Sequence, residues 1–304
     1  MLIGTAGAST FAYIANSESD NISVIDVTSN KVTATIPVGS NPMGAVISPD
    51  GTKVYVANAH SNDVSIIDTA TNNVIATVPA GSSPQGVAVS PDGKQVYVTN
   101  MASSTLSVID TTSNTVAGTV KTGKSPLGLA LSPDGKKLYV TNNGGEKTVS
   151  VIDTATKAVI STVSVGRSPK GIAVTPDGTK VYVANFDSRS ISVIDTVTNS
   201  VIDTVKVKAA PPSGIAVKPE GTKAYVTNVD KYFNTVSVID TGTNKITARI
   251  PVGPDPAGIA VTPDGKKVYV ALSFCNTVSV IDTATNTVTA TMNVGKNLTP
   301  QASL

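Results

Sequence analysis

The chain has 304 residues, a formal net charge of +2 and only 14% charged residues. It contains neither a basic run with interleaved aromatic residues nor an apolar stretch of about 18 residues, which argues against nucleic-acid binding and a membrane-spanning helix. The single cysteine, Cys275, excludes an intrachain disulfide framework.

One motif recurs along the whole chain at intervals of 42 to 44 residues. Each copy has a tyrosine inside an apolar run and, further on, an Ile-Asp pair. The tyrosines are Tyr13, Tyr55, Tyr97, Tyr139, Tyr182, Tyr225 and Tyr269. The aspartates are Asp26, Asp68, Asp110, Asp153, Asp195, Asp240 and Asp282. A period of this length is typical of a repeat architecture, and seven copies fill nearly the whole sequence.

Each copy holds four short runs rich in Val, Ile, Thr and Tyr, which suit β-strands. In the third copy they are residues 86–89, 95–100, 105–110 and 115–120, and polar turns such as Ser90-Pro91-Asp92-Gly93 separate them. No stretch has helical periodicity. The pattern predicts an all-β, seven-bladed β-propeller with four antiparallel strands per blade, as a single domain over residues 1–304.

The composition of the runs predicts their order from the axis outward. The first run places glycine and alanine on one face, as Gly86 and Ala88 do, and small residues permit close approach near an axis. The fourth run is more polar. We therefore expect the Pro-x-Gly run to be innermost and the fourth run outermost.

Ring closure involves both ends of the sequence. Residues 1–10 align without gaps to residues 43–52, one repeat later, and thus resemble an innermost strand with a degraded turn. Residues 300–302 also fall on the repeat. We expect Leu2–Ala6 to pair beside residues 11–16, and residues 300–304 to lie over the junction of the seventh and first blades.

Few residues suggest chemistry. His60 is the only histidine, without a second ligand at metal-binding spacing, and is expected to be a solvated loop residue. Cys275 has no basic neighbour in sequence and is expected to be a partly buried loop cysteine. The repeated aspartates of the Ile-Asp pairs and of the Pro-Asp-Gly turns are interpreted as turn-forming groups. Asn21 and Asn297 begin the N-x-Ser/Thr sequons, which are candidate glycosylation sites.

The loops between the second and third runs vary from copy to copy, and three of the four phenylalanines lie in them. These loops are expected on the same face as the connections between blades, with the uniform turns on the opposite face. Relaxed constraint on loop tips would also explain the variation. The alternative is a contact surface, because binding residues gather on loops of rigid scaffolds. Its candidate residues are His60, Met101, Phe186, Arg189, Tyr232, Phe233 and Phe274.

The sequence Tyr-Val-Thr-Asn occurs at residues 97–100, 139–142 and 225–228, and Tyr-Val-Ala-Asn at residues 55–58 and 182–185. With Pro-Asp-Gly and Ser-Val-Ile-Asp in the same order, the chain resembles the YVTN family of β-propeller repeats, and is most similar to archaeal surface-layer proteins. The seventh copy departs with Leu272, and the first lacks the Pro-Asp-Gly turn.

The resemblance implies a non-enzymatic structural and interaction protein of the extracellular cell surface. It would contact other surface proteins or glycans, or self-associate in a lattice, with no cofactor, catalytic residue, metal site or nucleic-acid partner. The alternative is a propeller enzyme of lactonase or cofactor-dependent oxidoreductase type, which would need a cluster of His, Arg or Glu residues, a metal set or a haem motif in the channel mouth. A third alternative is an intracellular scaffold of the propeller class that carries Trp-Asp motifs, but the chain has no tryptophan.

Overall fold

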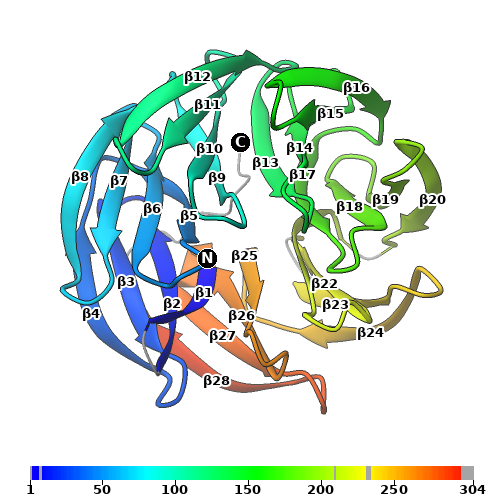
Figure 1. Cartoon of the computed structure of the whole chain (residues 1–304). Coiled ribbons are helices and arrows are strands. Elements are labelled where there is room, and N and C mark those ends of the chain that lie inside the picture. Colours follow the sequence, from blue (N-terminus) through cyan, green and yellow to red (C-terminus); the bar gives the residue numbers. More distant parts are fainter. Residues whose placement is uncertain (1, 7–8, 209, 231–233, 296–304) are drawn as a thin grey trace.

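The computed structural model describes residues 2–6, 9–208, 210–230 and 234–295. Its strands form seven separate antiparallel sheets arranged as blades in a ring (Figure 1). Each blade is built from four consecutive strands, and in the first blade these are β1 to β4. The only helical segment in the described residues is the short 3-10 helix η1 (Ser273–Cys275). The predicted seven-bladed β-propeller is confirmed.

The strands occupy equivalent positions in every blade. The innermost strands are β1 (Leu2–Ala6), β5 (Pro42–Ile47), β9 (Pro84–Val89), β13 (Pro126–Leu131), β17 (Pro169–Val174), β21 (Pro212–Val217) and β25 (Pro256–Val261). The second strands are β2 (Ser9–Asn16), β6 (Lys53–Asn58), β10 (Gln95–Asn100), β14 (Lys137–Asn142), β18 (Lys180–Asn185), β22 (Lys223–Asn228) and β26 (Lys267–Leu272). The third strands are β3 (Asn21–Asp26), β7 (Asp63–Asp68), β11 (Thr105–Asp110), β15 (Thr148–Asp153), β19 (Ser190–Asp195), β23 (Thr235–Asp240) and β27 (Thr277–Asp282). The outermost strands are β4 (Lys31–Pro37), β8 (Asn73–Pro79), β12 (Thr115–Lys121), β16 (Ala158–Ser164), β20 (Ser200–Lys206), β24 (Lys245–Pro251) and β28 (Thr287–Asn293).

Burial follows the predicted order of the strands. The second and third strands are buried along most of their length, whereas the outermost strands alternate and are largely exposed. Adjacent innermost strands approach closely, and a Cβ on Gly86 or Gly128 would lie 2.5 Å from a carbonyl oxygen of the next blade. Glycine is therefore required at this point of the Pro-x-Gly run.

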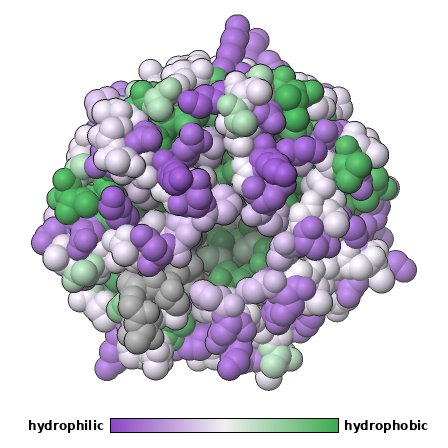
Figure 2. Space-filling view, in the orientation of Figure 1, coloured by the Kyte–Doolittle hydropathy of each residue, from purple (hydrophilic) through white to green (hydrophobic). Residues whose placement is uncertain are grey.

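The apolar core is divided into seven layers, each lying between two neighbouring blades. One such layer joins Tyr55 and Ile66 of the second blade to Val87 and Val98 of the third. Each blade thus buries both faces of its middle strands, which explains why these strands are apolar almost throughout. Figure 2 shows that the ring surrounds a central hollow with apolar residues on its wall.

The ring closes by side-chain packing between the seventh and first blades. Ile14 and Ile25 share a core layer with Tyr269 and Val280. As predicted, β1 pairs antiparallel with β2, with Leu2 opposite Tyr13. Residues 300–304, expected over this junction, lie outside the described residues.

Candidate functional site

The two ends of the ring carry different kinds of connection. We call the end with the first-to-second and third-to-fourth strand turns the turn face. The Thr69 hydroxyl on this face donates to the Gly51 carbonyl at 2.7 Å, joining both kinds of turn. We call the opposite end, with the second-to-third loops and the connections between blades, the loop face. There the Ala59 N–H donates to the Asn41 carbonyl at 2.9 Å. The predicted assignment of the connections to the two faces is confirmed.

The repeated aspartates of the turn face are used by the turns themselves. A carboxylate oxygen of Asp68 accepts hydrogen bonds from the N–H and the hydroxyl of Thr71, both at 2.8 Å. Asp92 accepts from the Ser90 hydroxyl at 2.6 Å and from the Lys94 N–H at 3.1 Å. These hydrogen bonds lower the pKa of both carboxyl groups because they favour the charged form. The interpretation of these residues as turn-forming groups is confirmed.

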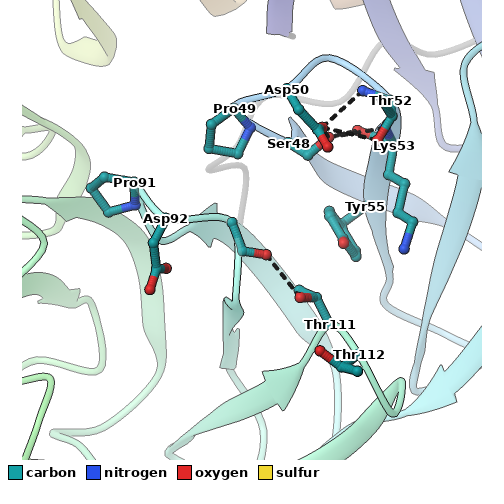
Figure 3. A pocket seen from close by; sticks show the side chains of 11 residues that line it. Ser48, Pro49, Asp50, Thr52, Lys53, Tyr55, Pro91, Asp92, Thr111 and Thr112 are labelled. Carbon is teal, nitrogen blue, oxygen red and sulfur yellow. Dashed lines mark hydrogen bonds between the residues drawn. The ribbon is translucent and has the colours of Figure 1, made fainter.

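Shallow hollows lie on the turn face where two blades meet. One hollow of about 420 Å³ is lined by Asp50, Lys53 and Tyr55 of the second blade and by Asp92 and Thr111 of the third (Figure 3). Hollows with corresponding residues lie at the next two junctions. Their polar groups hold together the two turns of one blade, as the Thr111 hydroxyl does by donating to the Gly93 carbonyl at 2.8 Å. They also join neighbouring blades, as Lys137 Nζ does by donating to the Thr196 carbonyl at 2.6 Å. We therefore interpret the hollows as structural junctions.

A lysine and a tyrosine of one blade bond to a turn of the next blade. Lys267 Nζ donates to the Val27 carbonyl at 2.7 Å, and the Tyr269 hydroxyl donates to Asn30 Oδ1 at 2.7 Å. The Tyr182 hydroxyl makes the corresponding bond to Asn244 at 2.6 Å. Burial raises the pKa of Tyr139, Tyr182, Tyr225 and Tyr269 to about 12.

At the junction of the third and fourth blades, both the lysine and the turn asparagine are replaced by other residues. The fourth blade has Lys157 where its neighbours have the turn asparagine, and the third blade has Gln95 where most copies have lysine. The Tyr97 hydroxyl accordingly donates to Gln95 Oε1 at 2.6 Å, within its own strand. The paired departure from the repeat in Gln95 and Lys157 is visible in the sequence.

The predicted contact residues of the loop face differ in exposure. His60 and Arg189 are exposed, whereas Met101 and Phe186 are half-buried. The expectation that His60 is a solvated loop residue is confirmed. Tyr232 and Phe233 lie outside the described residues, as does the side chain of Phe274. Cys275 is exposed, so the expectation of a partly buried cysteine was wrong, because η1 turns this residue outward.

The loops vary in side chains but share one backbone geometry. An equivalent residue of each described loop has a positive φ between 47° and 59°. These residues are Asp20, Asn62, Ser104, Lys147, Arg189 and Asn276. The loop face is therefore a set of similarly shaped positions that carry different side chains.

Of the two candidate glycosylation sites, Asn21 lies within the described residues. Asn21 is the first residue of β3, and its side-chain amide is occupied: Oδ1 accepts from Asn16 Nδ2 at 2.7 Å, and Nδ2 donates to the Ser19 carbonyl at 2.9 Å. A glycan on Asn21 would be attached to Nδ2, the atom that donates to Ser19. Asn297 lies outside the described residues.

A buried lysine lies on the loop face, at the start of the innermost strand β17. The Lys170 side chain is only 8% exposed, and its Nζ lies 3.8 Å from the centre of the Phe186 ring. Burial lowers the pKa of Lys170, while Asp187 and Asp255 oppose this shift. Burial also raises the pKa of Asp255, and Lys170 opposes it. Lys170 of the fifth blade and Asp255 of the seventh thus influence each other's pKa.

Sequence reasoning missed this pair, although the repeat contains a signal for it. The other Pro-x-Gly runs carry uncharged residues at the position of Lys170, namely Met43, Gln85, Leu127, Ser213 and Ala257. The residues that precede the proline are likewise uncharged except at Asp255: Asn41, Ser83, Ser125, Ser168 and Pro211. In the described part of the chain, no group of three or more His, Cys, Asp or Glu residues could hold a metal ion.

The ring of consecutively formed blades defines the protein as a β-propeller. The model of the YNCE-like beta-propeller family matches residues 2–134. The model of the Choice-of-anchor I domain matches residues 102–255 and, about one blade further on, residues 145–304, half of the chain each time. This β-propeller therefore belongs to the Choice-of-anchor I domain family.

Two solved structures have the same fold along almost their whole length. Hydrazine synthase from Kuenenia stuttgartiensis is 25% identical, with a TM-score of 0.83, and the match covers 93% of this chain and 95% of that one. A functionally unknown protein from Desulfotomaculum acetoxidans is 19% identical, with a TM-score of 0.81, covering 95% and 99% of the two chains. No curated protein matches the sequence. No helix in the described residues is long and apolar enough to cross a membrane.

Proposed function

We propose that the protein is a non-enzymatic structural and interaction protein of the cell surface, and that its loop face contacts other surface proteins or glycans. The observation that carries this proposal is the combination of uniform loop backbone with variable side chains on one face only. Such a face can change its partner without disturbing the ring. The resemblance of the repeats to archaeal surface-layer proteins supports an extracellular location and lattice self-association.

The test is association of the purified protein, with itself and with surface extracts, measured by sedimentation and pull-down. The loop-face variant combines His60→Ser, Met101→Gln and Arg189→Asn. The asparagine keeps the positive φ at residue 189, since Asn62 and Asn276 already occupy equivalent positions. The matched turn-face variant combines Lys94→Ser, Thr112→Ser and Val197→Ser, all exposed. Association should fall for the first variant alone; an equal loss for both variants would contradict the proposal.

A second candidate is an enzyme of lactonase or cofactor-dependent oxidoreductase type. Lys170 favours it, because a buried amine with a lowered pKa can act as a base or nucleophile. The structural likeness to an enzyme, hydrazine synthase, is in line with it at 25% identity. Turnover of lactone substrates or of redox dyes that Lys170→Met abolishes would favour this candidate over the first.

A further inference from the structure

The seven blades provide an internal control for what each position of the repeat requires. Packing at the start of the innermost strand is satisfied by uncharged residues in the other Pro-x-Gly runs, so the fold does not require the charge of Lys170. The same argument applies to Asp255, whose equivalents are polar or apolar but uncharged. Both departures lie on the loop face, and each charge influences the other. Because both charged residues lie on the same face, their charges indicate a function other than formation of the blades.

Lys170 differs from the other lysines that the ring buries in part. Nζ of Lys137, Lys180 and Lys267 donates to a carbonyl of the following blade at 2.6 to 2.7 Å. Lys170 Nζ has the Phe186 ring at 3.8 Å, but across the residues that the structure describes it has neither a hydrogen bond nor an ion pair. A buried ammonium group that lacks acceptors is costly, since it loses water without replacement. The stacking on Phe186 compensates only part of that loss.

The carboxylate of Asp255 is the acidic counterpart of the Lys170 ammonium group. Its side chain is half-buried, and its carboxylate accepts no hydrogen bond from any described residue, although its backbone carbonyl accepts from the Ser273 N–H at 3.0 Å. Asp187, the second acidic neighbour of Lys170, is instead held by the Ser168 hydroxyl. The loop face therefore has one donor group and one acceptor group without a hydrogen-bond partner among the described residues, with a second carboxylate nearby.

We propose that this part of the loop face, where the innermost strands β17 and β25 begin, binds a saccharide whose hydroxyl groups lie between Lys170 and Asp255. A hydroxyl can accept a hydrogen bond from the ammonium group and donate one to the carboxylate, so one neutral ligand completes both. An anionic ligand would meet repulsion from Asp187 and Asp255, and a cationic ligand would be repelled by Lys170. The inference rests on the proposed function and narrows its partners to glycans.

The test uses the complete protein and four probes: the methyl glycosides of glucose, mannose, galactose and N-acetylglucosamine. Saturation-transfer NMR detects binding, and calorimetry measures the affinity of any glycoside that binds. Lys170→Met and Asp255→Asn should each weaken that affinity about tenfold or more, because the first removes the charged donor and the second replaces the charged acceptor by a neutral amide oxygen. Gln85→Met is the matched control at the equivalent position of the third blade, and should bind like the wild type.

Three outcomes would overturn the proposal: no binding of any glycoside to the wild type, equal loss in the Gln85→Met control, or Lys170-dependent binding of glycine or inorganic phosphate in place of the sugars. Thermal unfolding adds an independent readout. Lys170→Met should raise the melting temperature while sugar binding is lost, whereas a lysine with a purely structural role would lower it. Sugar binding without loop-face association would leave this inference standing and the proposed function wrong, and association without sugar binding would do the reverse.

Discussion

The turn face and the loop face show two ways in which a repeat can use its residues. On the turn face the side chains are repeated because they make the structure, as Asp68 and Asp92 do through hydrogen bonds inside their own turns. On the loop face the backbone is repeated while the side chains vary, and Arg189 stands where another blade has Asn62. Repetition of side chains thus indicates structural need, and repetition of backbone alone leaves side chains free for contacts. Four predictions test this difference, from the largest expected effect to the smallest.

High pH should unfold the ring through the tyrosines beneath the turn face. The pKa of Tyr139, Tyr182, Tyr225 and Tyr269 is about 12 in the folded protein, against about 10 in an unfolded chain. Their contribution to stability is therefore complete below pH 10 and is lost as the pH rises towards 12. Tyrosinate absorbance and circular dichroism should change together. Ionisation of these phenols near pH 10 with the fold intact would contradict the prediction.

Two tyrosine variants should separate hydrogen bonding from burial. Tyr182→Phe removes the bond to Asn244 and should lower the free energy of unfolding by about 1 kcal/mol. Tyr225→Phe removes a buried hydroxyl that has no partner among the described residues, so it should leave stability unchanged or raise it. Denaturant titrations of both variants measure the difference. Equal destabilisation would mean that the hydroxyl of Tyr225 is bonded in solution.

Asp92→Ala should lower the free energy of unfolding by about 1 kcal/mol at neutral pH, since it removes two hydrogen bonds of the turn. The pKa of Asp92 is lowered in the folded state, so its contribution exists above the ordinary aspartate pKa of about 4 and disappears as the pH falls below it. The stability difference between variant and wild type should shrink in acid. Partner association should stay intact, and its loss at full stability would place binding on the turn face.

The combined loop-face variant His60→Ser, Met101→Gln and Arg189→Asn should have the smallest effect on stability. Two of these side chains are exposed and one is half-buried, so the free energy of unfolding should change by no more than about 0.5 kcal/mol. Thermal unfolding beside the Asp92→Ala variant gives the comparison. A larger loss than in Asp92→Ala would show that the loop face is part of the stabilising framework.

Much of the fold could be predicted because each blade is specified by short-range interactions. The Pro-Asp-Gly and Ile-Asp turns bond within a few residues, so β10 and β11 begin and end at the predicted residues. The candidate site was less accessible to sequence reasoning. Sequence variation indicates where the loop face lies, but the positive φ shared by Ser104, Lys147 and Arg189 does not follow from their residue types. Cys275 was placed wrongly because a 3-10 turn replaces the usual loop there.

The sequence by itself determined the number of blades, the order of strands within each blade and the structural role of the repeated aspartates, because these depend on contacts inside one repeat. The tertiary structure decided which side chains meet between repeats. The bond of Tyr269 to Asn30 across the closure of the ring is one such contact, and the influence of Asp255 on the pKa of Lys170 likewise links separate blades. Such pairs come together only when the blades close around a common axis, since the curvature of the ring sets which residues of separate blades face each other.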